Sequence, residues 1–332
     1  MSPSARTVFL GTGGFAVPVL EALALHPVVD LVGVVTSPPR PAGRGGRSRP
    51  SPVADWLAQH DTGSTAAGVV LMTPSRLRAS ESVDAVRDLE PDLVVLADYG
   101  QIVPRVLLEL PRHGALNLHP SLLPRHRGAT PVQSTILAGD REAGTSLMVM
   151  DEGLDTGPLI AQRRVPLTGR ETASGLEAGL AALSAELLRE ELAPWLAGER
   201  VARPQPEESA TLTRSLRRED GRLDPHRPAE ELARQVRAYR PWPGSFLETD
   251  IGRLVVWSAE ALVPVGQPPA EPGTLLAWGD GLGLATSQGV LRLSEVQPAG
   301  GRRMSGAELR RGRQGVIGSR MADPEASKAS RR

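Results

Sequence analysis

Short apolar runs alternate with helix-like stretches through the first half of the chain. The runs are four to six residues long, at residues 7–11, 31–36, 69–72, 93–96 and 115–119. Several are apolar throughout, which is typical of parallel strands buried on both faces. Helical spacing is found between them, at residues 15–25, 52–60, 75–90 and 130–138. We therefore predict an α/β fold with a Rossmann-like, doubly wound and mostly parallel sheet.

The second half has a different pattern. A long helix-like stretch, 172–196, closes the first unit, and residues 197–213 are polar, rich in proline and without periodicity, as in a linker. One helical stretch and five short strand-like runs with glycine-rich turns follow, at residues 229–239, 245–248, 254–258, 273–277, 283–286 and 290–296. Such short strands predict a small β-barrel. The expected division is a domain at 1–196, a linker at 197–213, a domain at 214–315 and a flexible tail at 316–332.

Composition removes several classes of protein. The chain has no cysteine, which excludes disulfides, thiolate zinc sites and a cysteine nucleophile. Its 38 basic and 38 acidic residues cancel, so nucleic-acid binding has to depend on local basic patches. No apolar run is long enough to span a membrane, and the first residues do not resemble a signal peptide. We expect a cytoplasmic protein without membrane contact.

The first strand-like run ends in the sequence GTGGFA, residues 11–16, which satisfies the G-x-G-x-x-A pattern of dinucleotide sites. NAD also requires an acidic residue about 20 positions later, where this chain has Thr36 and Ser37. Arg40 and Arg44 could accept a 2′-phosphate, so an NADP-dependent reductase remains an alternative. A tight strand-to-helix turn that needs glycine is the simpler interpretation.

Polar side chains gather where a late strand ends. Asn117 and His119 are two residues apart on one strand and therefore share a face, at the carboxyl edge where open α/β sheets bind ligands. Asp155, in a glycine-rich loop 36 residues after His119, could orient the imidazole and carry protons. Amide and imidazole donors aimed at one point favour a developing oxyanion. Without an activated serine, a cysteine or a metal-ligand pattern, this trio indicates direct acyl transfer.

The run NLHPSLLPRHRGATPVQSTILAGDREAGTSLMVMDEGLDTGPLI, residues 117–160, resembles the core segment of the folate-dependent formyltransferases. The resemblance extends over about residues 6–313. It implies that Asn117, His119 and Asp155 are the catalytic trio and that 10-formyltetrahydrofolate is the formyl donor, with no metal. It also implies that four residues contact the folate: Ser121, Leu122, Leu123 and Pro124.

Other segments bear on the acceptor. The arginine-rich loop 37–52 resembles the tRNA-contacting insertion of those family members that formylate methionine on initiator tRNA, and segments 239–244 and 296–305 resemble their OB-like C-terminal domain. Initiator Met-tRNA is therefore the expected acceptor, for a protein expected to be a monomer. We expect tRNA contacts at eight arginines: Arg40, Arg44, Arg47, Arg49, Arg214, Arg218, Arg302 and Arg303. Alternative acceptors are an amino-sugar nucleotide or glycinamide ribonucleotide, and a non-catalytic RNA-binding protein is a rival from another class.

Three departures from the family's wording qualify this resemblance. Gly13 stands where relatives commonly have proline, and His126 stands where an aromatic residue often follows Pro-Arg. Residues 213–215 read Thr-Arg-Ser where Ala-Pro-Lys is usual. The role of that lysine would pass to Arg214 or Arg218, or be absent.

Overall fold

The structure is a computed structural model that describes residues 4–42, 47–60, 68–262 and 270–321. The chain forms two compact units. Unit 1 comprises Met1–Pro131, Glu142–Pro166 and Gly175–Arg214, and unit 2 comprises Val132–Arg141, Leu167–Ser174 and Ser215–Arg332. Two short segments from the part of the chain before Gly175 therefore pack with the C-terminal part. Within the described ranges, no helix combines the length and apolar character needed to cross a membrane.

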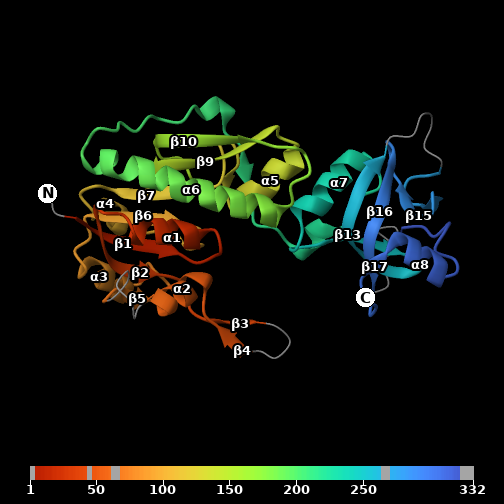
Figure 1. The fold of residues 1–332 in the computed structure, drawn as a ribbon, viewed down its shortest axis with the longest axis horizontal. Coiled ribbons are helices and arrows are strands. Elements are labelled where there is room, and N and C mark those ends of the chain that lie inside the picture. The colour runs from red at the N-terminus through yellow and green to blue at the C-terminus, as the bar shows by residue number, and fades with distance from the viewer. Residues whose placement is uncertain (1–3, 43–46, 61–67, 263–269, 322–332) are drawn as a thin grey trace. The chain divides into compact units, whose positions relative to one another are not determined.

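Unit 1 is built on a seven-stranded sheet in the order β10-β9-β7-β6-β1-β2-β5 (Figure 1). The strands are β1 (Ala5–Gly11), β2 (Val29–Val35), β5 (Val70–Met72), β6 (Leu93–Ala97), β7 (Ala115–His119), β9 (Glu142–Val149) and β10 (Leu159–Pro166). From β5 to β7 all neighbours are parallel, and β9 and β10 extend the sheet in antiparallel fashion. The predicted α/β class with a mostly parallel sheet is confirmed.

Helices cover both faces of this sheet. They are α1 (Ala16–Ala24), α2 (Pro52–His60), α3 (Ser80–Arg87), α4 (Arg105–Glu109) and α6 (Ala173–Leu196). On one face of the sheet, Val83 of α3 and Leu107 of α4 belong to an apolar cluster that also contains Val8 and Val94. Alternate residues of each strand point to this face, so every second strand residue can join the cluster. Helix α1 packs against β1, β2 and β6, and the hydroxyl of Ser184 in α6 lies 2.6 Å from that of Thr145 in β9.

The helix expected at 75–90 begins later, at Ser80. The side chain of Gln101 explains the difference, because it accepts a hydrogen bond from Leu77 N and donates one to Pro74 O. Backbone groups that a helix would use are thus bound by a side chain from another segment, and Leu77 is buried as part of a loop.

Unit 2 contains an antiparallel sheet in the order β12-β13-β16-β15-β14, with β17 beside β16. Its elements are β12 (Ser245–Thr249), β13 (Gly252–Leu262), β14 (Leu275–Trp278), β15 (Gly281–Ala285), β16 (Val290–Pro298), β17 (Met304–Ser305), α7 (Ala229–Ala238) and α8 (Gly306–Gly312). Leucine and valine side chains of these strands form one core with α7 and α8. The predicted C-terminal β domain is confirmed.

Residues 316–321 differ from the flexible tail that the sequence predicts. Val316 is buried in the core of unit 2, and Ser319 is also buried. Ser319 O accepts a hydrogen bond from Leu275 N at one edge of the sheet, and Arg320 O accepts one from Asp250 N beside the other edge. This segment therefore joins the two edges, which the polar composition of the whole stretch 314–332 does not reveal. Residues 322–332 lie outside the described residues.

The segment expected to be a linker, 197–213, packs within unit 1. It contains a 3₁₀ turn (Glu207–Ser209) and β11 (Leu212–Thr213), which pairs in parallel with β8 (Arg127–Gly128). Gln205 is only 7% exposed. The remaining elements are α5 (Pro131–Ala138), the 3₁₀ turn Arg218–Gly221 and the hairpin of β3 (Arg40–Ala42) and β4 (Arg47–Arg49).

Candidate active site

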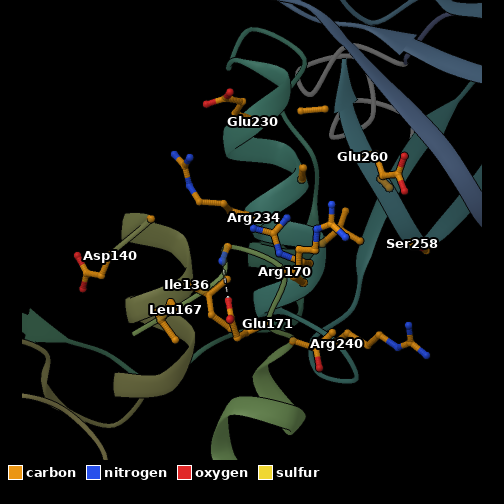
Figure 2. A pocket seen from close by; sticks show the side chains of 18 of the residues that line it. Ile136, Asp140, Leu167, Arg170, Glu171, Glu230, Arg234, Arg240, Ser258 and Glu260 are labelled. Carbon is orange, nitrogen blue, oxygen red and sulfur yellow. Dashed lines mark hydrogen bonds between the residues drawn. The ribbon is translucent and has the colours of Figure 1, made fainter. Parts of the chain in front are cut away.

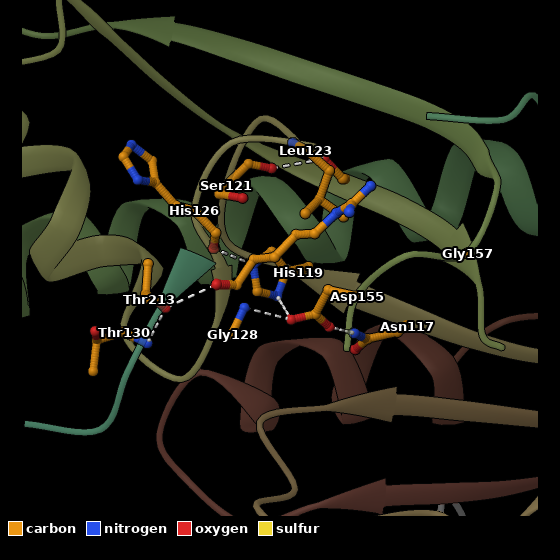
Figure 3. Close-up of polar contacts among 12 residues, drawn as sticks. Asn117, His119, Ser121, Leu123, His126, Gly128, Thr130, Asp155, Gly157 and Thr213 are labelled. Atoms are coloured by element: carbon orange, nitrogen blue, oxygen red, sulfur yellow. Dashed lines mark hydrogen bonds and ion pairs between the residues drawn. The ribbon is translucent and has the colours of Figure 1, made fainter. Parts of the chain in front are cut away.

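Strand β7 carries the first two residues of the predicted trio. Asn117 and His119 lie on one face near its carboxyl end and are 6% and 5% exposed. Asp155 comes from the loop between β9 and β10, with its side chain 14% exposed. Figure 3 shows the Asp155 carboxylate between Asn117 and the His119 ring. The structure thus brings together three side chains that the sequence places up to 38 residues apart.

The contacts of His119 assign its ring nitrogens. Nε2 lies 3.1 Å from the backbone oxygen of His126, and because a carbonyl can only accept, Nε2 carries a hydrogen. Nδ1 lies 3.7 Å from Asp155 Oδ2, and Asn117 Nδ2 donates to Asp155 Oδ1 over 3.4 Å. Nδ1 is therefore the histidine nitrogen left for chemistry. Because the His126 contact uses backbone, the departure from an aromatic residue at that position leaves it intact.

Both carboxylate oxygens of Asp155 accept hydrogen bonds, Oδ1 from Asn117 and Oδ2 from the backbone of Gly128. Gly128 N donates to Oδ2 over 2.7 Å, and Asp155 itself has a left-handed backbone with φ +54°. Gly128 has φ +104°, and a Cβ there would lie 2.5 Å from the backbone oxygen of Thr213. Only glycine suits both this conformation and this approach. The short β8–β11 ladder therefore sets the position of the amide that holds Asp155.

The segment of the four expected folate contacts follows β7 directly and is held by hydroxyl and amide groups. Ser121 Oγ donates to Arg125 O over 2.7 Å. Ser146 Oγ donates to Ser121 O and accepts from Leu123 N, and Gln162 Nε2 donates to Leu123 O. The sequence did not single out Ser146 or Gln162, because their spacing from the segment gives no local signal.

The GTGGFA turn approaches Asp98 at the end of β6. Thr12 N donates to Asp98 O over 2.9 Å, and a Cβ at Gly13 would lie 1.8 Å from Asp98 Oδ2. Burial, together with the charge of Glu177, raises the pKa of Asp98 to about 6, while a hydrogen bond from Gly13 acts in the opposite direction. The carboxyl group thus fills the space next to Gly13, which accounts for glycine at a position where proline is common.

The arginines expected to contact tRNA lie in several places. Arg40 and Arg49 are exposed and paired across the β3–β4 hairpin. Arg218 lies 5.9 Å from the ring centre of Trp242, and Arg303 lies 3.9 Å from that of Trp257. Arg302 donates to Glu308 over 3.1 Å. Of the others, Arg214 accepts from Thr130 through its backbone oxygen, Arg44 lies outside the described residues, and Arg47 is described only in its backbone.

Unit 2 holds a hollow of about 740 Å³ that none of the trio lines (Figure 2). Its charged lining residues are Arg170, Arg234, Arg237 and Arg240 with Asp140, Glu171, Glu230 and Glu260. Figure 2 shows Asp140, Glu230 and Arg240 at separate places around it, pointing away from one another. Because its charged lining residues balance and the polar groups of the trio converge in unit 1, the chemistry indicates the trio as the candidate active site.

Comparison with known proteins places this geometry in a family. A model described as formyl transferase matches residues 5–192, and one described as formyl transferase, C-terminal domain, matches residues 215–314. A methionyl-tRNA formyltransferase of Halorhodospira halophila is 43% identical over 316 residues, covering 95% of this chain and 98% of the relative. One from Myxococcus xanthus is 43% identical over 315 residues, covering 95% and 97%.

Solved structures share the fold at lower identity. The N-formyltransferase of Helicobacter canadensis, in complex with folinic acid and dTDP-3-aminofucose, has a TM-score of 0.62 at 16% identity and covers 87% of this chain and 98% of that one. HypX of Aquifex aeolicus, in complex with tetrahydrofolic acid, has a TM-score of 0.58 at 16% identity over 94% of this chain. The chain spans about half the length of HypX, 48%. Both family models and the full-length relatives agree, and the chain belongs to the formyl transferase family, among the methionyl-tRNA formyltransferases.

Proposed function

We propose that the chain transfers the formyl group of 10-formyltetrahydrofolate to the α-amino group of methionine on initiator tRNA. The observation that carries this proposal is the convergence of Asn117, His119 and Asp155, in a chain whose full-length relatives have the name of this activity. Folinic acid and tetrahydrofolic acid in two proteins of the same fold support a folate donor. The relatives do not favour the amino-sugar, glycinamide ribonucleotide or NADP-dependent alternatives.

The proposed reaction passes through one tetrahedral intermediate, formed between the two substrates, and no acyl-enzyme forms. The amine nitrogen attacks the formyl carbon, and the formyl oxygen becomes a tetrahedral oxyanion. We assign as its donors Asn117 Nδ2 and, when the ring is protonated and carries a hydrogen on both nitrogens, His119 Nδ1, because both face the point next to Asp155. When the bond from carbon to the folate nitrogen breaks, the carbonyl re-forms and the amine proton passes to that nitrogen. Asp155, 14% exposed, is assigned to carry the proton through water.

Substrate binding is assigned to other groups. We propose that Ser121, Leu122, Leu123 and Pro124 contact the folate beside the trio. The eight arginines named above would contact tRNA phosphates, with the exposed pair Arg40 and Arg49 on the hairpin of unit 1. Phosphate contacts give strongly salt-dependent affinity. Since the acceptor is an aminoacyl-tRNA, we place the reaction in the cytoplasm, carried out by a monomer made of the two units described above.

Transfer of labelled formyl from 10-formyltetrahydrofolate to charged initiator tRNA tests the proposal. Glycinamide ribonucleotide and a dTDP-amino sugar serve as competing acceptors, and label in the tRNA alone is the expected result. His119→Ala should lower turnover about 100- to 1,000-fold with both substrates saturating, which is the usual effect of losing an oxyanion donor. Near-normal turnover of this variant would overturn the assignment, and label in a competing acceptor would overturn the choice of substrate.

A further inference from the structure

Behind Asp155 lies a buried network that joins the segment before β11 to the loop after β7. Its centre is the side chain of Arg127, which is 4% exposed. Arg127 donates to Gln205 Oε1 through Nε and Nη2, over 3.1 and 2.9 Å. It also donates to both carboxylate oxygens of Glu207 through Nη1 and Nη2, over 3.0 and 2.7 Å. A buried guanidinium therefore has its charge balanced and most of its hydrogens bound.

The amide nitrogen of Gln205 faces the catalytic loop. Nε2 donates to the backbone oxygens of Asp155 and Gly157, over 2.9 and 2.7 Å. These two bonds hold the chain on either side of Thr156, next to a residue with φ +54°. A left-handed conformation at a non-glycine residue persists only where its surroundings hold it. Gln205 supplies that constraint from the backbone side of Asp155.

Arg127 constrains the other side. The residue before it, His126, accepts from His119 Nε2 through its backbone oxygen, and the residue after it, Gly128, donates to Asp155 Oδ2. One tripeptide thus contacts both His119 and Asp155. Its middle side chain binds Gln205, which holds the backbone of Asp155. The ring and the carboxylate are therefore positioned by one continuous set of bonds.

We propose that Gln205 and Arg127 are positioning residues that set the distance between Asp155 and His119. This inference rests on the proposed function of the trio. Neither residue is assigned to substrate: both act through the trio, Gln205 by binding the backbone of the Asp155 loop and Arg127 by binding Gln205. Loss of the Gln205 amide leaves two carbonyls without their donor and lets the loop relax away from His119. Misplacement of a catalytic group by about 1 Å can cost about 100-fold in rate.

Unit 2 offers a matched control in Gln235. This glutamine is also buried, at 2% exposed, and its Nε2 donates to two backbone oxygens, those of Asp220 and Arg222. Its Oε1 accepts from Arg227, which is paired with Glu231. The same chemistry therefore occurs in the other unit, in bonds that involve neither the trio nor Gln205. A purely structural role predicts equal consequences for the two glutamines.

The experiment compares Gln205→Leu, Gln205→Glu and Gln235→Leu in the full chain, by kcat, both KM values and thermal unfolding. Gln205→Leu should lower kcat about 10- to 100-fold and change each KM less than about twofold. Gln205→Glu keeps the acceptor for Arg127 and, when ionised, removes both donors, so kcat per folded molecule should again fall, with thermal unfolding reporting the cost of the carboxylate facing two carbonyls. Gln235→Leu should lose stability with kcat unchanged per folded molecule.

Equal kcat values for Gln205→Leu and Gln235→Leu would overturn the positioning role, as would a Gln205→Glu variant with wild-type kcat. A rise in KM alone would overturn it too, since it would indicate substrate binding. An inactive wild-type chain would instead refute the proposed function. If the wild-type chain is active and His119→Ala is inactive, the proposed function stands, and the Gln205 variants then test the positioning role alone.

Discussion

The two units differ in what their buried polar groups bind. In unit 2, Thr249 and Thr286 donate to nearby backbone oxygens and stabilise turns around an apolar core. In unit 1, Asn117, His119 and Asp155 point at one another at the carboxyl end of strand β7. Local satisfaction of polar groups builds a stable scaffold, whereas convergence of polar groups from distant segments builds a site that can act on a substrate.

Unit 2 contributes three of the arginines that we assign to tRNA, and none of the trio. The arginines of unit 2 that we assign to tRNA lie near its surface, where Arg302 is paired with Glu308 and Arg303 stacks on Trp257. Exposed ion pairs of this kind contribute little to folding, so these arginines remain available to exchange a carboxylate for a phosphate. Unit 1 should therefore determine the rate of the reaction, and the affinity for tRNA should depend on the arginines of both units, those of unit 2 included.

The largest expected effect is on chemistry in unit 1. Asn117→Ala removes one of the two proposed oxyanion donors, so kcat should fall about 100- to 1,000-fold. The KM for tRNA should stay near its wild-type value, because Asn117 is assigned to the oxyanion and the phosphate contacts are assigned to arginines. Steady-state kinetics with each substrate varied measures both quantities. A loss expressed only in KM would break the division between the units.

A core substitution in unit 2 should change stability instead. Leu284 is fully buried, and Leu284→Ala should lower the free energy of unfolding by about 2 to 5 kcal/mol through lost contacts and a cavity. Chemical denaturation measures this, and kcat per folded molecule should not change. Ile317→Ala, at a residue 42% exposed, is the control and should cost less than about 1 kcal/mol. Loss of kcat with intact folding would show that unit 2 takes part in the chemistry.

Removal of surface arginines in unit 2 should weaken tRNA binding. The double variant Arg302→Ala, Arg303→Ala should raise the KM for charged tRNA and leave kcat unchanged. It should also reduce the slope of log affinity against log salt by about 1 per lost phosphate contact. Arg87→Ala, which breaks an exposed pair with Asp84 in unit 1, is the matched control. An unchanged salt slope would show that these two arginines do not contact the tRNA.

The smallest effect concerns Asp98. Its pKa is raised from 3.8 to about 6, so the folded state binds this proton more tightly than the unfolded state. Stability is therefore gained as pH falls from about 6 toward 4, and the ionised group destabilises the fold above pH 6. Asp98→Asn should raise Tm by about 1 to 3 °C at pH 7.5, because solvent contact limits the gain, and change it little at pH 4.

Thermal unfolding at the two pH values checks this prediction, with the exposed Asp88→Asn as control. Equal pH dependence of the two variants would contradict it. Substitution at the neighbouring turn sharpens the test, because a Cβ at Gly13 would meet Asp98 Oδ2. Gly13→Ala should be tolerated better together with Asp98→Ala than alone, as a double-mutant cycle would measure.

Much of the fold could be predicted from periodicity. Buried parallel strands such as β6 and β7 produce uninterrupted apolar runs, and the predicted helix at 172–196 matches α6 (Ala173–Leu196) within one residue. Asn117 and His119 could be found because alternation along one strand places them on one face. Their grouping with Asp155 began as a hypothesis from the glycine-rich loop and was then implied by the resemblance to a family, and the structure places the three side chains near one another.

Other features had no signal in the sequence. Residues 316–321 stand at the start of a mostly polar C-terminal stretch, yet the backbone of this segment hydrogen-bonds to both edges of a sheet. Segment 197–213 has no periodicity that predicts its packing, because individual side chains fix it. In the sequence, Gln205 is one polar residue between two prolines, and nothing nearby indicates its partners. Asp98 and Gly13 are 85 residues apart, and neither predicts the other until the turn and the strand end are seen side by side.

The sequence by itself determined the class of fold, the strand that carries the first two catalytic candidates and the family, because these depend on local patterns and on motif wording. The tertiary structure decided which nitrogen of His119 is free, what holds Asp155 and why Gly13 is glycine. Each of these depends on contacts such as Gln205 with Asp155, 50 residues apart, or Arg127 with Gln205, 78 apart. Hydrogen bonds over such separations follow from how the chain folds back on itself, and no local property of either residue encodes its partner.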